Sequence, residues 1–311
     1  GFTKIGLGNL TLNAAATYTG PTTLSAGTLT IGANNALGVG GNLTLGGGTT
    51  LALGTNSLSH ALVTTSGASP LITGTGTINA TTGFFFNHTG DTTIDAVLAG
   101  SGGLLKTQSN VVTLTGASTY TGTTEVQDGT LSINSIRSVG GGSSAIGAPT
   151  TAENGVIRMG LTTVATILQY TGAGHTSDRL IGMQGTTGGV TIDADGTGAL
   201  VLGGVRTENA GAKTLTLRGS SDALIGNTLG AIREIGAILT VNKTDGNTWI
   251  LSEKNTYSGA TQVDNGILRL GVDDALPVAT ALRIGTGATA GTLVLNGFDQ
   301  TIGSLVSETN T

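Results

Sequence analysis

Apolar residues recur at every second position in short runs along the chain, and small polar residues fill the positions between them. Leu10 and Leu12 form one such pair, and Leu29 and Ile31 form another. A period of two is typical of a short β-strand with one buried face. The same spacing recurs in Leu43/Leu45, Leu51/Leu53, Val190/Ile192, Leu200/Leu202, Leu215/Leu217, Leu239/Val241, Leu282/Ile284 and Leu293/Leu295. Glycine- and asparagine-rich breaks between the pairs permit tight turns. The pattern predicts an all-β protein without amphipathic helices.

Three stretches repeat one pattern around the tyrosines Tyr18, Tyr120 and Tyr257. A leucine lies six positions before each tyrosine, a glycine two positions after it, and a second glycine nine positions after it. These repeat positions are Leu12, Leu114 and Leu251; Gly20, Gly122 and Gly259; and Gly27, Gly129 and Gly266. Their fixed places favour an architectural role, with each tyrosine ring packed over a turn and its hydroxyl bonded locally.

The composition distinguishes among the β architectures. The 311 residues include 54 Gly and 57 Thr, whereas aromatic residues make up only 3%. A sandwich favours longer strands and a more aromatic core, and the signature of a propeller is missing. A right-handed parallel β-helix fills its narrow interior with stacked aliphatic residues and suits this chain. We therefore expect one continuous β-solenoid, an elongated rod over residues 1–311, with coils of about 20–22 residues and repeat units at about 5–104, 105–238 and 239–311.

The tyrosine-centred run resembles the autotransporter-associated β-strand repeat, also called the passenger-associated transport repeat. The best matches are Asn9–Ile31, Val111–Ile133 and Thr248–Leu270, and residues 168–198 and 291–298 resemble segments that accompany this repeat. The resemblance implies a parallel β-helix in an exported passenger, at the extracellular or outer-membrane surface of a Gram-negative-type bacterium, and it implies no catalytic residues. The chain opens at Gly1 without an initiator methionine. We expect a fragment of a longer chain, whose end coils either continue or meet other copies end to end.

Charge and cysteine usage narrow the possible partners. The net charge is −5, and the 13 basic residues are scattered singly, so nucleic acid is not an expected partner. The absence of cysteine excludes disulfides and thiolate metal sites. No apolar run reaches the ~18 residues of a membrane span. No phosphate loop or complete dinucleotide fingerprint occurs, and we expect no cofactor and no metal.

Two aspartate pairs are the candidates for catalysis. Glycoside hydrolysis requires two carboxylates, and alternation places Asp193 and Asp195 on one outward face. The same residues also fit an ordinary strand end followed by a turn. Asp273 and Asp274 precede Pro277 and are better explained as a solvated turn. A calcium loop that begins at Asp193 lacks the glutamate that it needs.

The histidines and the phenylalanine cluster offer weaker signals. His60, His88 and His175 have no partner at ligand spacing, and we expect each at a turn or on the surface. Alternation along Phe84-Phe85-Phe86 predicts that some rings are buried and the rest exposed, which makes the cluster either a contact patch or a satellite core.

These observations support a non-catalytic stalk, spacer or surface fibre as the first hypothesis. The second is an adhesin that binds a glycan or a host or cell-surface protein through a solenoid face or through the insertion at residues 137–143, where a turn shared with the other copies arrives late. The third, less supported, is a polysaccharide-active enzyme. Adjacent coils of the same or a neighbouring chain are the partners that every version of the hypothesis requires.

Overall fold

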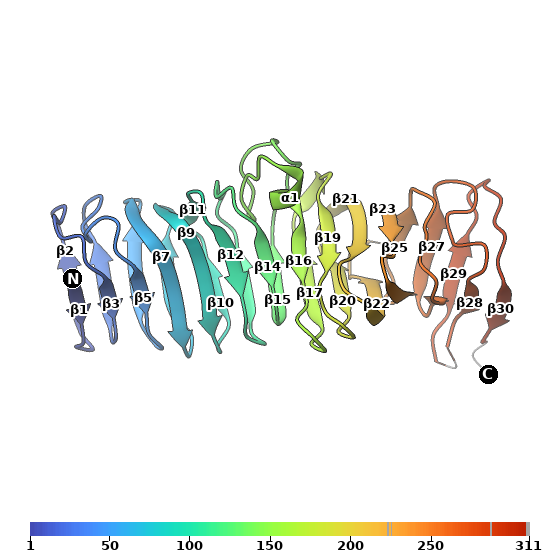
Figure 1. The fold of residues 1–311 in the computed structure, drawn as a ribbon, viewed down its shortest axis with the longest axis horizontal. Coiled ribbons are helices and arrows are strands. Elements are labelled where there is room, and N and C mark those ends of the chain that lie inside the picture. The colour runs from blue at the N-terminus through green and yellow to red at the C-terminus, as the bar shows by residue number, and fades with distance from the viewer. Residues whose placement is uncertain (223, 225, 287, 309–311) are drawn as a thin grey trace. The chain divides into compact units, whose positions relative to one another are not determined.

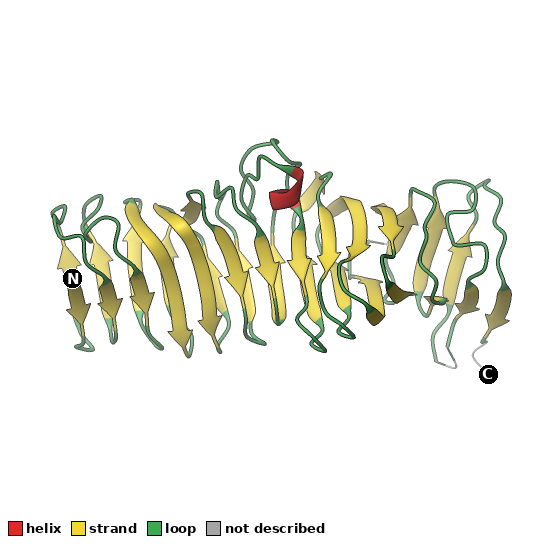
Figure 2. Ribbon diagram, viewed as in Figure 1, coloured by secondary structure: helices red, strands yellow, loops and turns green. Residues whose placement is uncertain are grey.

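A computed structural model describes residues 1–222, 224, 226–286 and 288–308 (Figure 1). The chain forms two compact units, Gly1–Gly155 and Val156–Thr311. Strands and turns make up nearly all of each unit, as Figure 2 shows. The described residues include one short helix, α1 (Ala152–Gly155). The expected all-β class is confirmed. Continuity of a single solenoid over 1–311 stays a prediction.

The first unit consists of two parallel sheets whose strands alternate along the chain. The first sheet contains β1 (Phe2–Lys4), β3 (Thr22–Leu24), β5 (Leu43–Leu45), β7 (Leu58–Gly67), β9 (Thr77–His88), β12 (Gly103–Lys106) and β14 (Thr124–Val126), and β11 (Val97–Ala99) pairs with β9. The second sheet contains β2 (Asn9–Leu12), β4 (Thr28–Ile31), β6 (Thr50–Gly54), β8 (Leu71–Gly74), β10 (Thr92–Ile94), β13 (Val111–Leu114) and β15 (Gly129–Ile133). Apart from β11 and β12, which both belong to the first sheet, consecutive strands belong to opposite sheets, as in a solenoid.

The second unit repeats this arrangement. Its first sheet contains β16 (Ile157–Met159), β19 (Leu180–Met183), β21 (Gly198–Thr207), β23 (Gly226–Arg233), β25 (Thr248–Leu251), β27 (Gly266–Leu270) and β29 (Gly291–Val294), and β18 (Ala173–Thr176) pairs with β21. Its second sheet contains β17 (Thr166–Tyr170), β20 (Val190–Ala194), β22 (Gly211–Arg218), β24 (Ala237–Lys243), β26 (Thr261–Val263), β28 (Ala281–Ile284) and β30 (Ser304–Ser307).

The register gives the length of each coil. In the first unit, partners in neighbouring coils are 19 to 22 residues apart, from Val111↔Thr130 to Thr28↔Thr50. In the second unit the spacing varies more, from 19 residues in Ile250↔Arg269 to 27 in Val205↔Ile232. The predicted coil length therefore holds in the first unit, whereas turns of different length separate the strands of the second.

Stacked aliphatic residues fill the interior of each unit. In the first unit Leu29, Leu51 and Ile72 pair in register and are at most 1% exposed. Similar ladders in the second unit include Leu202, Leu229, Leu251 and Leu270. The chain buries these side chains coil on coil, which explains how a chain with so few aromatic residues forms a core.

No helix among the described residues is long and apolar enough to cross a membrane.

Candidate functional site: repeat positions and outward polar groups

Each of the three repeat tyrosines makes the same hydrogen bond. The hydroxyls of Tyr18, Tyr120 and Tyr257 lie 2.8, 2.8 and 2.7 Å from the Oγ1 atom of the threonine four residues later. Tyr120 and Tyr257 are 0% and 1% exposed, whereas Tyr18, in the first coil, is half-buried. Burial raises the pKa of Tyr257. The ring therefore packs inside the coil while its hydroxyl stays satisfied.

The repeat glycines are needed for two different steric reasons. Gly27, Gly129 and Gly266 adopt φ values of +70°, +71° and +69°, the left-handed region that L-residues disfavour. A Cβ atom at any of them would lie 2.3–2.5 Å from a carbonyl oxygen of the preceding coil. A Cβ atom at Gly20, Gly122 or Gly259, whose φ is not positive, would lie 2.4–2.6 Å from the backbone of the preceding coil. Both glycine positions thus allow the coils to approach closely.

A buried lysine is a repeat position that the sequence analysis missed. Lys4, Lys106 and Lys243 each lie fourteen residues before a repeat tyrosine, and they are 7%, 0% and 0% exposed. Their Nζ atoms donate hydrogen bonds to oxygens of two successive turns. The acceptors are Gly6 O and Ala26 O for the first; Gln108 O, Asn110 Oδ1 and Asp128 O for the second; and Thr244 O, Asp245 O and Asn265 O for the third.

The position of these lysines within the ladders explains how a charge is accommodated in the interior. Lys106 occupies the same inward column as Phe86 and Val126, and Lys243 pairs with Leu217 and Val263. The alkyl stem covers the core while the ammonium group reaches the turns. Burial lowers the pKa of both Lys106 and Lys243 to about 8.

The structure brings Asp193 and Asp195 together and gives both of them partners. Arg218 holds Asp193 at 2.7 Å (Nη2–Oδ2), and the Asp193 side chain is only 7% exposed. Burial raises the pKa of Asp193. Burial also acts to raise the pKa of Asp195, but hydrogen bonds from Gln169 and Ser220 outweigh it and lower that pKa. The pair thus links three successive coils.

Asp273 and Asp274 accept hydrogen bonds from the backbone of the turn in the following coil. Asp273 Oδ1 accepts a hydrogen bond from Asp299 N at 2.9 Å, and Asp274 Oδ1 accepts one from Thr301 N at 3.1 Å. Asp274 has a φ of +50°, as does Asn35 at the matching turn of the first copy. Asparagine and aspartate tolerate this left-handed conformation better than most residues.

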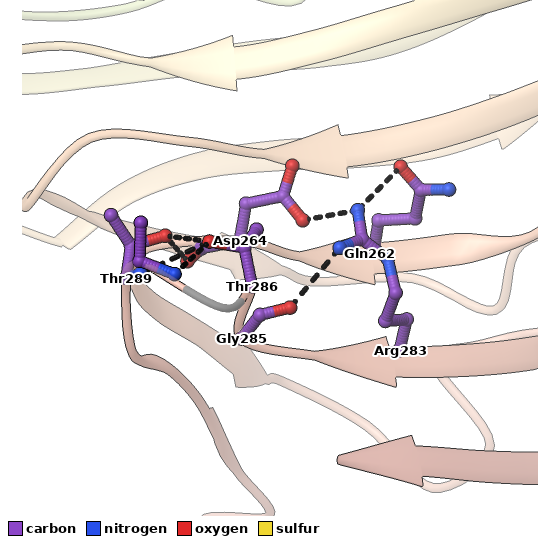
Figure 3. Close-up of polar contacts among 7 residues, drawn as sticks. Gln262, Asp264, Arg283, Gly285, Thr286 and Thr289 are labelled. Atoms are coloured by element: carbon purple, nitrogen blue, oxygen red, sulfur yellow. Dashed lines mark hydrogen bonds and ion pairs between the residues drawn. The ribbon is translucent and has the colours of Figure 1, made fainter. Parts of the chain in front are cut away.

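Outward charges near the end of the second unit also pair across coils. Figure 3 shows Arg283, on β28, between side chains of the preceding coil. Its Nη2 atom lies 2.5 Å from Asp264 Oδ1 and 3.2 Å from Gln262 Oε1, and its Nη1 atom donates to Gly285 O. Thr289 Oγ1 donates to Asp264 O at 2.6 Å. The guanidinium group therefore links β28 and the turn that follows it to the preceding coil.

The expectation that all three histidines lie at turns or on the surface is wrong for two of them. His60 and His88 are 2% and 1% exposed, because they occupy inward positions of the long strands β7 and β9. The Nδ1 atom of His88 lies 2.7 Å from Thr65 Oγ1. Burial lowers the pKa of both. His175 is half-buried beside Tyr170, at 2.7 Å.

Strand alternation sorts the phenylalanines as predicted. Phe84 and Phe86 are 2% and 1% exposed, whereas Phe85 faces outward and is partly exposed. Phe85 borders a surface hollow of about 360 Å³ on the first sheet of the first unit. The cluster therefore contributes both to the core and to the surface.

The insertion at residues 137–143 forms a loop before α1, and the green segment that follows β15 in Figure 1 projects beyond the neighbouring turns of its unit. Gly140 N donates to Pro149 O at 2.9 Å, and Gly141 N donates to Ser138 O at 2.8 Å. Residues 140–143 are exposed. Among the described residues, no group of three or more His, Cys, Asp or Glu side chains could hold a metal ion.

Comparisons with known proteins identify the repeat. The passenger-associated-transport-repeat family matches residues 2–31, 104–133 and 241–270. A curated relative, the Adhesin BmaC autotransporter of Brucella suis biovar 1 (strain 1330), is 32% identical over 271 aligned residues, and the match covers 79% of this chain and 7% of that protein. The chain thus spans a small part of that relative's length. No solved structure gives a significant match. Each matched stretch contains one of the buried lysines and its tyrosine, and the chain is a β-solenoid protein that carries three passenger-associated transport repeats.

Proposed function

We propose that this chain is a structural, non-catalytic segment of a passenger that a Gram-negative-type bacterium exports to its outer surface, where the solenoid serves as a stalk or spacer. The proposal rests on the contacts that the repeat lysines, tyrosines and glycines make. The lysine ammonium groups bind turn carbonyls, the tyrosines bond locally, and the glycines permit close coil contact. The repeated residues therefore stabilise the stacking of one coil on the next. The name of the Brucella relative, an autotransporter adhesin, supports the surface location.

The enzyme alternative has less support from the geometry. A general acid or base must reach the substrate, but the carboxylate of Asp193 is nearly buried and ion-paired with Arg218. Asp195 accepts hydrogen bonds at both of its oxygens. Activity of the chain on a uronate or neutral polysaccharide, abolished by Asp193→Asn, would contradict the structural assignment.

An exchange experiment in the full passenger tests the spacer role. Residues 1–311 are deleted in one strain and replaced in another by an equal number of coils from a different part of the same passenger. If the segment is a spacer, its deletion should impair the activity of the passenger regions that it holds away from the cell. The replacement should restore that activity. If the replacement is as defective as the deletion, the outward residues of this segment matter and the spacer role is refuted.

Adhesion is a second candidate, favoured by the name of the relative and by the exposed residues 140–143 of the inserted loop. If this loop is the contact, deleting residues 137–143 abolishes binding to the surface glycan or protein and leaves the circular dichroism melt unchanged; a contact on a solenoid face survives the deletion. Retained binding in the deletion variant would exclude this loop as the contact.

A further inference from the structure

We propose that the outward face around Phe85 in the first unit is a binding site for a neutral hexopyranose unit of a glycan. The inference deepens the adhesin candidate by naming a place and a ligand class, and it rests on that candidate. It stands on three features of this face, namely its shape, its one outward aromatic ring and its free polar groups.

The shape arises from two glycines in register. Gly83 on β9 pairs with Gly103 on β12, and neither residue contributes a side chain to the lining of the hollow. Phe85, Leu105 and Glu125 form the next outward column, one residue on each of β9, β12 and β14. The hollow between them measures about 360 Å³, which falls in the ~300–1,000 Å³ range of small-molecule sites.

The outward column that contains Phe85 changes from polar to apolar residues at β9. Its preceding members, Thr44 and Thr64, are small and polar, as is usual on the outward face of this chain. Phe85 and Leu105 then place a ring and an aliphatic side chain in partial contact with solvent. Phe84 and Phe86, buried on the opposite face, anchor the strand on both sides of the ring. A pyranose ring presents a face of C–H groups that stacks on such a ring and loses contact with water.

The polar groups of the hollow match hydroxyl groups rather than charges. Glu125 Oε1 accepts a hydrogen bond from Gln127 Nε2 at 2.7 Å, which orients the carboxylate. Its Oε2 atom and the hydroxyls of Thr82 and Thr123 have no hydrogen-bond partner among the described residues. Sugar hydroxyls donate strongly to a carboxylate and accept from amide and hydroxyl groups. The described residues that line the hollow include a carboxylate and no cationic side chain, which disfavours an acidic sugar.

An extended peptide fits this face less well. Peptides that add to a sheet bind an unpaired edge through their backbone. Here the backbone of β12 is paired on both sides, with β9 and with β14. Only side chains are available in the hollow.

Saturation-transfer NMR on the purified 311-residue chain tests the site. The probes are methyl α-D-glucopyranoside, methyl α-D-galactopyranoside and methyl α-D-mannopyranoside. We expect saturation transfer to the ring protons of at least one probe, and a loss of affinity of about tenfold in Phe85→Thr, since stacking on the ring is lost. Threonine continues the Thr44–Thr64 column, so the fold is retained. Glu125→Gln keeps the shape and should weaken binding, whereas Thr44→Ala, outside the hollow, should leave it unchanged.

Three results would overturn the site. The first is no transfer to any of the three probes. The second is transfer that Phe85→Thr leaves unchanged. The third is an apolar peptide that binds in the hollow where the sugars do not. Since the purified chain is used, surface location does not affect this assay, and a failed sugar site is distinguishable from a failed surface assignment.

Discussion

Replacing Lys243 by methionine removes the ammonium group and keeps a chain of similar length. In the native structure this group is fully buried and donates to Thr244 O, to Asp245 O at 2.7 Å and to Asn265 O at 3.2 Å. Asn265 lies in the next turn, 22 residues along the chain, so the lysine joins two coils. Methionine fills the column between Leu217 and Val263 but leaves the carbonyl oxygens without a donor.

The expected loss of stability follows from two opposing effects. A hydrogen bond from a charged donor contributes about 2 kcal/mol, which makes the three bonds worth about 6 kcal/mol in the folded state. Removing the charge also removes the net cost of burying it, which lowers the pKa of Lys243 from 10.5 to about 8 and corresponds to about 3 kcal/mol. The net destabilisation is therefore about 3 kcal/mol. For a cooperative unit of this size it corresponds to a melting temperature lower by about 6–12 °C.

Thermal unfolding followed by far-UV circular dichroism measures this change, and Lys254→Met is the matched control. The Lys254 side chain is 67% exposed and lies 3.9 Å from Asp274, so its replacement should shift the melting temperature by at most about 2 °C. Equal shifts in the two variants would refute the assignment of Lys243 as a link between coils.

Three further changes test other repeat and core positions. Gly129→Ala should destabilise the protein by about 2 kcal/mol more than Gly140→Ala, because both have a positive φ (+71° and +72°) but only a Cβ at Gly129 meets a backbone oxygen, at 2.5 Å; equal denaturation midpoints would contradict this. Tyr257→Phe removes one buried hydrogen bond and should cost about 1 kcal/mol in the same assay, and an unchanged midpoint would show that the bond contributes nothing. Burial lowers the pKa of His60 and His88 below the usual 6.5, so the unfolded chain binds more protons and stability is lost as the pH falls below 6.5. The melting temperature should therefore drop between about pH 7 and pH 5, less so in the His60→Gln/His88→Gln double variant, and identical pH profiles would refute the histidine contribution.

The fold was predictable because its determinants are local and repeat. Leu29 and Ile31 mark a strand whose inward residues are buried, and Phe84-Phe85-Phe86 alternates as a strand requires. The turn at Asn35 matches that at Asp274 in both sequence and φ. Each of these features depends on neighbours within a few residues, which the sequence displays directly.

Features that depend on contacts between coils were not predictable in the same way. Lysine is almost never fully buried in proteins, so Lys106 and Lys243 would be assigned to the surface by residue type. Both lysines lie fourteen residues before a repeat tyrosine. This fixed spacing marks them as repeat positions, although they are not apolar. Asp193 faces outward as expected, but Arg218, 25 residues later, covers it from the next coil. A partner one coil away leaves no mark in the local sequence.

The most direct test of the central claim is labelling of intact cells that express the full passenger with Ser143→Cys. Residue 143 is exposed in the loop before α1, and this chain has no cysteine of its own. A membrane-impermeant maleimide should label the variant on intact cells to the same extent as after lysis, and the passenger without the substitution provides the background. Labelling that appears only after lysis would contradict the account of a surface passenger segment.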